Sequence, residues 1–146
     1  MSPLPALLFT GWCTALSTHD LRARRLPNLL TLPGAAVALG YGFAVGRPWF
    51  AALGGALLAL PYLAIHLCAP HALGAGDVKL ALGLGAVTAL AGTQTWVWAA
   101  LAAPMITAAA GVGASVSSRG LDPVGRTLPH GFAMCTASVV ALLAGP

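Results

Sequence analysis

Residues 49–67 have the sequence WFAALGGALLALPYLAIHL, an apolar run that contains no Asp, Glu, Lys or Arg. A helix needs about 20 such residues to cross the hydrocarbon core of a membrane. Five further apolar stretches, rich in Ala, Leu and Gly, fill most of the remaining chain. We therefore expect an all-α polytopic membrane protein with about six transmembrane helices.

The composition supports this expectation and excludes several other classes. Of the 146 residues, 58% are hydrophobic and 7% are charged, and the mean hydropathy is +0.86. Soluble domains carry about 25% charged residues. An ordinary soluble enzyme, a disordered protein and a nucleic-acid-binding domain are therefore excluded. Six spans use roughly 120 positions, so we expect one transmembrane domain over residues 1–146, in contact with lipid and without an extramembrane domain.

Charged, Pro-rich and Gly-rich turns divide the chain into its expected spans. These are residues 3–18, 28–45, 49–67, 77–91, 96–112 and 130–143. Six basic residues fall on one side of this arrangement: Arg22, Arg24, Arg25, Lys79, Arg119 and Arg126. The other side holds only Arg47. Because cytoplasmic loops carry an excess of Lys and Arg, the first side is expected to be cytoplasmic, with both termini outside.

Two aspartates occupy corresponding positions in this layout. Asp20 ends the first span, and Asp77 opens the fourth. Acidic residues at the edge of the hydrocarbon are costly and mark functional or paired groups. At one depth on different helices, two such carboxyls can meet and share a proton. The ionised one could then activate water while the protonated one polarises a carbonyl, which is acid/base peptide hydrolysis.

Each of these residues also has a purely structural interpretation. Asp20 could form an ion pair with the basic residues that follow it, and Asp77 could cap the fourth helix. The glycines before Asp77 could simply mark a loop, and Lys79 could anchor its helix at the interface. Asp122 is followed by Pro123 and is typical of a turn.

Neither histidines nor cysteines show the spacing of a metal site. The histidines are His19, His66, His71 and His130, and the cysteines are Cys13, Cys68 and Cys135. All four histidines fall on the cytoplasmic side, but they match no HExxH or CxxC-type pattern. We therefore expect no metal and no cofactor.

Two segments resemble the motifs of the prepilin peptidases, membrane aspartic proteases of the GxGD class. Residues 74–80, GAGDVKL, are similar to the GxGD-x-K-L signature of that family. Residues 20–31, DLRARRLPNLLT, resemble its other segment, in which an Asp and a basic residue precede a Leu-Pro-Asn-x-x-Thr run. The two motifs occur in the right order and on the same expected side of the membrane.

The resemblance implies that Asp20 and Asp77 are the catalytic pair. It further implies that the substrate is a prepilin or pseudopilin, whose short basic leader is removed at the cytoplasmic face of a bacterial or archaeal cytoplasmic membrane. Positions supporting the site by the same resemblance are Gly74, Gly76, Lys79, Pro27 and Asn28. Pro27 would rigidify the start of the second span, which Asn28 could cap. The glycines would allow close approach of the substrate or a facing helix.

The sequence departs from the long members of this family. Those members carry a cytoplasmic region with paired CxxC motifs and also methylate the new N-terminus. This sequence contains no CxxC and resembles the short stand-alone peptidases of Flp/Tad-type pilus systems, so methyltransferase activity is not expected. Residues 129–132, PHGF, resemble the family's Pro/Gly/Phe-rich segment only loosely and receive no role.

Three other functions fit parts of the pattern. An ion or proton-coupled transporter could use the two aspartates as a relay. A non-catalytic subunit of a pilus or secretion machine would need neither carboxyl. A peptidase of the same GxGD class could act instead on preflagellins or other signal peptides.

Overall fold

A computed structural model describes residues 3–23, 26–70, 73–117 and 130–144. These residues form six helices and no strand, which confirms the expected all-α fold class. The helices are α1 (Pro3–Ala23), α2 (Asn28–Ala44), α3 (Pro48–Cys68), α4 (Ala75–Ala91), α5 (Thr93–Ser117) and α6 (His130–Ala144). Five expected spans lie within one of these helices and the span 28–45 ends one residue beyond α2, so the Pro and Gly punctuation predicted the element order correctly.

Two helices are several residues longer than expected. Helix α1 continues to Ala23, so residues 19–23 are helical and Asp20 lies within the last turns of α1. Nothing in this segment breaks a helix before Pro27. Helix α5 is also longer than expected, because it begins at Thr93 and continues to Ser117.

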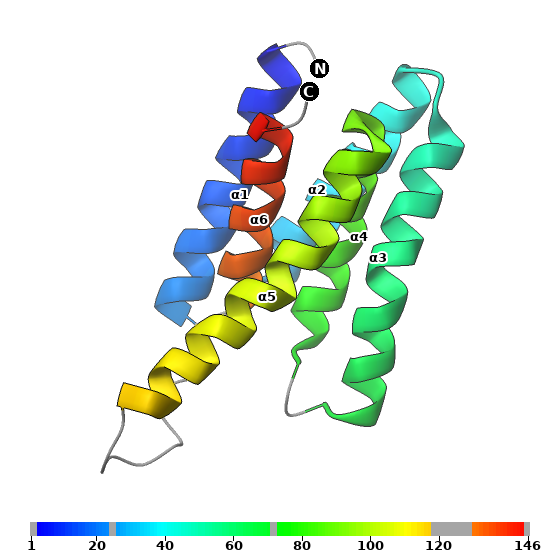
Figure 1. The fold of residues 1–146 in the computed structure, drawn as a ribbon. Helices are drawn as coiled ribbons and strands as arrows, with labels where there is room; N and C mark the ends of the chain where they lie inside the picture. The colour runs from blue at the N-terminus through cyan, green and yellow to red at the C-terminus, as the bar shows by residue number, and fades with distance from the viewer. Residues whose placement is uncertain (1–2, 24–25, 71–72, 118–129, 145–146) are drawn as a thin grey trace.

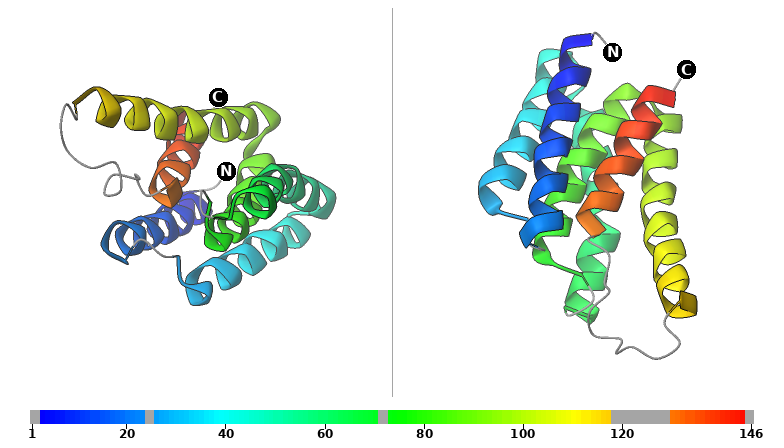
Figure 2. Two further views of the ribbon diagram at one scale, coloured as in Figure 1. Left: turned by 90° about the horizontal axis from the view of Figure 1, so that it is seen from below. Right: turned by 90° about the vertical axis from the view of Figure 1, so that its left-hand side faces the viewer.

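The helices form a bundle in which consecutive members run in opposite directions (Figure 1). The start of α1 and the end of α6 lie at one end of the bundle. The end of α1 and the start of α4 lie at the other end. Helix α4 packs against α2, α3, α5 and α6, and Figure 2 shows it enclosed by its neighbours. Its buried residues include Leu80, Ala81, Leu84 and Ala86, as expected of a helix that is apolar on all sides.

Glycines permit the close packing of α3 against α4. A Cβ atom on Gly55 would lie 2.7 Å from the carbonyl oxygen of Leu82, and one on Gly85 would clash with the carbonyl oxygen of Gly54. Small residues of this kind allow helix backbones to approach closely in lipid. This contact fixes the position of α4, which carries one of the two aspartates.

Gly85→Val is therefore expected to destabilise the bundle. The added side chain would overpack the α3–α4 contact, and overpacking costs about 1–3 kcal/mol. The midpoint of thermal unfolding in detergent should fall by several degrees. The matched control is Gly40→Val, on the exposed side of α2, where a Cβ meets nothing within 4 Å. Equal midpoints for the two variants would contradict this account of the packing.

Helix α3 has the length and composition of a membrane span, with 21 residues and a mean hydropathy of 1.8. Within the described part of the chain it is the one helix that meets both criteria. Helices α2 and α6 are apolar but shorter. Between α1 and α2 an apolar groove of about 550 Å³ opens on the surface.

Candidate active site

Asp20 and Asp77 lie at the same end of the bundle, on helices that are not neighbours in sequence. Asp20 lies near the C-terminal end of α1 and is only 6% exposed. Asp77 is the third residue of α4 and is half-buried. Leu26 lies against Gly76, the neighbour of Asp77, and against Gly131, which meets Asp20 Oδ2, so the two acids flank the same side chain. The structure thus brings together the two acids singled out in the sequence.

The first turn of α6 holds the Asp20 carboxyl. The backbone N–H of Phe132 donates a hydrogen bond of 3.0 Å to Asp20 Oδ2. The N–H groups at the start of a helix lack partners within the helix and form its positive end, which favours a carboxylate. A Cβ on Gly131 would lie 2.9 Å from the same oxygen, so the backbone of α6 meets Asp20 directly. The Asp20 carboxyl thus has its partner on α6.

Asp77 is oriented by the turn that precedes α4. Its Oδ2 accepts a hydrogen bond of 3.2 Å from the backbone N–H of Gly74, the N-cap residue. In return the Asp77 N–H donates to the Gly74 carbonyl at 3.1 Å. Asp77 therefore closes the capping turn from the third helical position instead of occupying the N-cap itself. A Cβ on Gly74 would make only an ordinary contact with Asp77, so sterics do not require glycine there.

Leu26 packs between the starts of α4 and α6. A Cβ on Gly76 would lie 2.9 Å from the Leu26 Cβ, and a Cβ on Gly131 would lie 3.0 Å from the Leu26 Cδ1. The two glycines therefore let the segment after α1 approach both helices. The expected close approach at Gly76 is made by this segment of the chain itself.

Gly76→Val is expected to spare the fold but abolish leader removal. The larger side chain would push Leu26 away from α4 and shift Asp77, and a shift of about 1 Å can cost a hundredfold in rate. Cleavage of a pilin precursor, followed by gel shift, measures the effect. Gly11→Val is the control, because a Cβ on Gly11 meets nothing within 4 Å. Full activity of Gly76→Val would contradict the packing argument.

A side-chain hydrogen bond joins α2 to α4 at the end of the bundle that holds the aspartates, next to Pro27. Lys79 Nζ donates a hydrogen bond of 2.8 Å to Asn28 Oδ1. The expectation that Asn28 caps α2 is wrong, because Pro27 is the N-cap residue and no side chain caps this helix. The carbonyl of Pro27 accepts the N–H groups of Leu30 and Thr31. Lys79 thus links α4 to α2 by a hydrogen bond and also carries a positive charge at this end of the bundle.

Two residues that the sequence did not point to lie beside the carboxyls. The rings of Tyr62 on α3 and His130 on α6 are 5.4 Å apart between centroids. The charge of Asp77 acts on Tyr62, and that of Asp20 acts on His130. His130 belongs to the PHGF segment that received no role from the sequence. The loose family likeness of that segment was the one available signal.

The other histidines lie away from this pair of rings. His19 is exposed, and His66 Nδ1 lies 2.7 Å from the Leu73 carbonyl oxygen, where it holds the segment between α3 and α4. His71 and Asp122 lie outside the described residues. Over the described ranges no three His, Cys, Asp or Glu residues come together in a way that could hold a metal ion.

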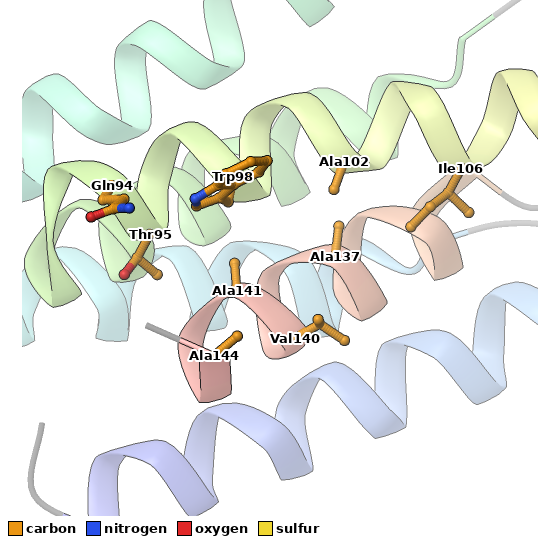
Figure 3. A pocket seen from close by; sticks show the side chains of 9 residues that line it. All are labelled: Gln94, Thr95, Trp98, Ala102, Ile106, Ala137, Val140, Ala141 and Ala144. Carbon is orange, nitrogen blue, oxygen red and sulfur yellow. The ribbon is translucent and has the colours of Figure 1, made fainter. Parts of the chain in front are cut away.

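A cleft of about 330 Å³ between α5 and α6 lies apart from the aspartates (Figure 3). Gln94, Thr95 and Trp98 line it from α5, and small or apolar side chains such as Val140 and Ala144 line it from α6. It contains none of the residues predicted for the site. The carboxyl end of α1 and the start of α4 therefore remain the candidate active site.

Comparison with known proteins now bears on this site. Searches of curated proteins and of solved structures yield no match to the chain. The sequence model of the type IV leader peptidase family matches residues 7–116, a range that includes both aspartates. This match covers most of the chain and confirms the resemblance seen in the two motifs. The chain therefore belongs to the type IV leader peptidase family.

Proposed function

We propose that this protein is a membrane-embedded aspartic endopeptidase that removes the short basic leader from prepilin or pseudopilin precursors at the cytoplasmic face. The observation that carries the proposal is the position of Asp20 in the last turns of α1 and of Asp77 in the first turn of α4, at the same end of the bundle. Membership in a leader peptidase family supports the reaction class. The reaction needs no cofactor.

The chemistry follows from two carboxyls that share one proton. The ionised carboxyl takes a proton from water as the water oxygen bonds to the scissile carbonyl carbon. The protonated carboxyl gives its proton to the carbonyl oxygen, which yields a tetrahedral gem-diol. Collapse of this intermediate breaks the C–N bond: the second carboxyl, now ionised, takes back a proton from one hydroxyl, and the leaving nitrogen receives a proton from the first carboxyl. The hydrogen bond from Phe132 keeps Asp20 in place through these steps.

Surface apolarity supports a multi-pass location in the cytoplasmic membrane. Large side chains face outward along several helices, with Leu29, Phe43 and Trp49 more than 70% exposed. Such extensive apolar surface is characteristic of contact with membrane or partner. Arg22 and Lys79 belong to the end of the bundle that holds the aspartates, whereas Arg47 precedes α3 at the other end. The positive-inside rule then puts the aspartates at the cytoplasmic face, with six spans and both termini outside.

This location suits the proposed substrate. A prepilin has a basic leader followed by a hydrophobic helix, and that helix can enter the bilayer beside the enzyme. The scissile bond then lies at the membrane boundary, at the depth of Asp20 and Asp77. The 146 residues contain no CxxC motif, so we expect the new N-terminus to remain unmethylated.

The alternative functions are less well supported. A transporter site is expected near the middle of the membrane, but both aspartates lie at one end of the bundle. A non-catalytic assembly subunit would have no use for a carboxyl buried beside another carboxyl. Such a subunit would still support pilus assembly when both aspartates are replaced.

The decisive test is co-expression with a pilin precursor encoded near the gene. The wild type should remove the leader, which a gel shift detects, and mass spectrometry should find an unmethylated new N-terminus. The double variant Asp20→Asn/Asp77→Asn should leave the precursor intact. A chelator should not alter the wild-type result. Leader removal by the double variant would overturn the proposal, and sensitivity to the chelator would favour a metal-dependent reaction.

A further inference from the structure

His130 is fixed at the active-site end by contacts from three helices. As the first residue of α6 it lies two positions before Phe132, whose N–H holds Asp20. Its ring packs against the buried ring of Tyr62 on α3, with an angle of 43° between the planes. Its Nδ1 lies 2.8 Å from the Thr107 hydroxyl on α5. The ring therefore has one position and one orientation.

The Thr107 contact also bears on which ring nitrogen carries the proton. Thr107 Oγ1 lies 3.1 Å from the Ala103 carbonyl oxygen, to which it can donate its hydroxyl proton. With that proton on the Ala103 carbonyl, the Thr107 oxygen accepts from His130. We therefore assign the proton of the neutral His130 ring to Nδ1. In the neutral ring, Nε2 is left as an acceptor with a free lone pair.

Nε2 of His130 is buried and has no hydrogen-bond partner among the residues that the structure describes. A buried polar atom without a partner is costly, and its retention calls for a reason. Asp20 is held by the N–H of Phe132, in the same first turn of α6 that His130 begins, so the Asp20 carboxyl lies at this turn. A small molecule that donates two hydrogen bonds, such as water, could bind to both the carboxylate and the fixed imidazole acceptor.

We propose that His130 is a further catalytic residue, whose Nε2 accepts a hydrogen bond from the water that attacks the scissile bond. This inference rests on the proposed peptidase function. Two acceptors, Asp20 and His130, would accept hydrogen bonds from the two O–H groups of that water and so turn an oxygen lone pair towards the scissile carbonyl. Only the proton that faces Asp20 is transferred. The other stays on the oxygen, hydrogen-bonded to Nε2, so the balance of the hydrolysis is unchanged.

Variants of His130 separate this role from packing. His130→Phe keeps a ring against Tyr62 but removes the acceptor, and kcat should fall roughly ten- to a hundredfold while KM stays within about twofold. In His130→Gln the side-chain oxygen lies near the former Nε2, and kcat should recover to within about fivefold of wild type. The assay uses purified protein in detergent with a pilin precursor. Elution as a single species and an unchanged unfolding midpoint establish that each variant is folded.

A second pair tests the same role without altering the histidine. Thr107→Val removes the acceptor for the Nδ1 proton, so the ring can adopt the tautomer that protonates Nε2. kcat should fall several-fold. Thr107→Ser keeps the hydroxyl and should restore the wild-type rate. This pair decides the matter if neither His130 variant folds.

The outcomes distinguish this inference from the function on which it rests. Wild-type kcat in folded His130→Phe would overturn it, as would a rise in KM at unchanged kcat. Equal rates for Thr107→Val and Thr107→Ser would also count against it. Activity in Asp20→Asn or Asp77→Asn would instead overturn the peptidase mechanism. Inactive aspartate variants beside a fully active His130→Phe would leave the mechanism standing without His130.

Discussion

Asp20→Asn and Asp77→Asn are each expected to slow leader removal by about a thousandfold or more. Each carboxyl performs a step that the other cannot perform alone, because one takes the proton of water and the other protonates the carbonyl oxygen. Residues that act as a unit give non-additive losses. The double variant should therefore be about as slow as either single variant. An amide retains the size of the carboxyl but cannot exchange a proton.

Single-turnover cleavage of a pilin precursor by purified enzyme measures these rates. The matched control is His19→Asn, which changes the exposed residue next to Asp20 and should retain the wild-type rate. A tenth or more of the wild-type rate in either aspartate variant would contradict a shared mechanism. Losses that multiply in the double variant would indicate that the two residues act independently.

The positions of the helices could be predicted from the sequence because the apolar runs that form them are local features. Long apolar runs interrupted by Gly, Pro and charge set each helix, and α3 is the plainest case. The pairing of Asp20 with Asp77 followed from equal depth on one side of the membrane. It needed only the alternating direction of successive helices, which puts the end of the first and the start of the fourth on one side, and the distribution of basic residues.

The support around the carboxyls could not be predicted in the same way. Asp20 is held by a backbone N–H of Phe132, which lies 112 positions further along the chain. Every residue except proline carries such a donor, so nothing in the sequence marks it. His130 depends on Thr107 from another helix, and helix–helix contacts of this kind follow from the packed bundle. The expectation that Asn28 caps α2 failed for a similar reason, since its hydrogen-bond partner Lys79 comes from α4.

Gly131 is where this unpredicted support is most vulnerable. A Cβ at Gly131 would lie 2.9 Å from Asp20 Oδ2 and 3.0 Å from Leu26 Cδ1. Real Cβ atoms scarcely approach other atoms so closely, so the carboxyl or α6 must move. The hydrogen bond from Phe132 would then lengthen. Gly131→Ala is expected to lower kcat about a hundredfold, because a displacement near 1 Å in a catalytic group has that order of effect.

Gly131→Val extends the same argument to a larger side chain. It should remove activity entirely, because the branched chain displaces both the Asp20 carboxyl and Leu26. Gly40→Ala and Gly40→Val are the matched controls, since a Cβ there meets nothing within 4 Å. Kinetics of precursor cleavage give kcat, and the unfolding midpoint separates loss of activity from loss of fold. A folded Gly131→Ala enzyme with wild-type kcat would mean that α6 does not position Asp20. The catalytic acids would then depend on α1 and α4 alone.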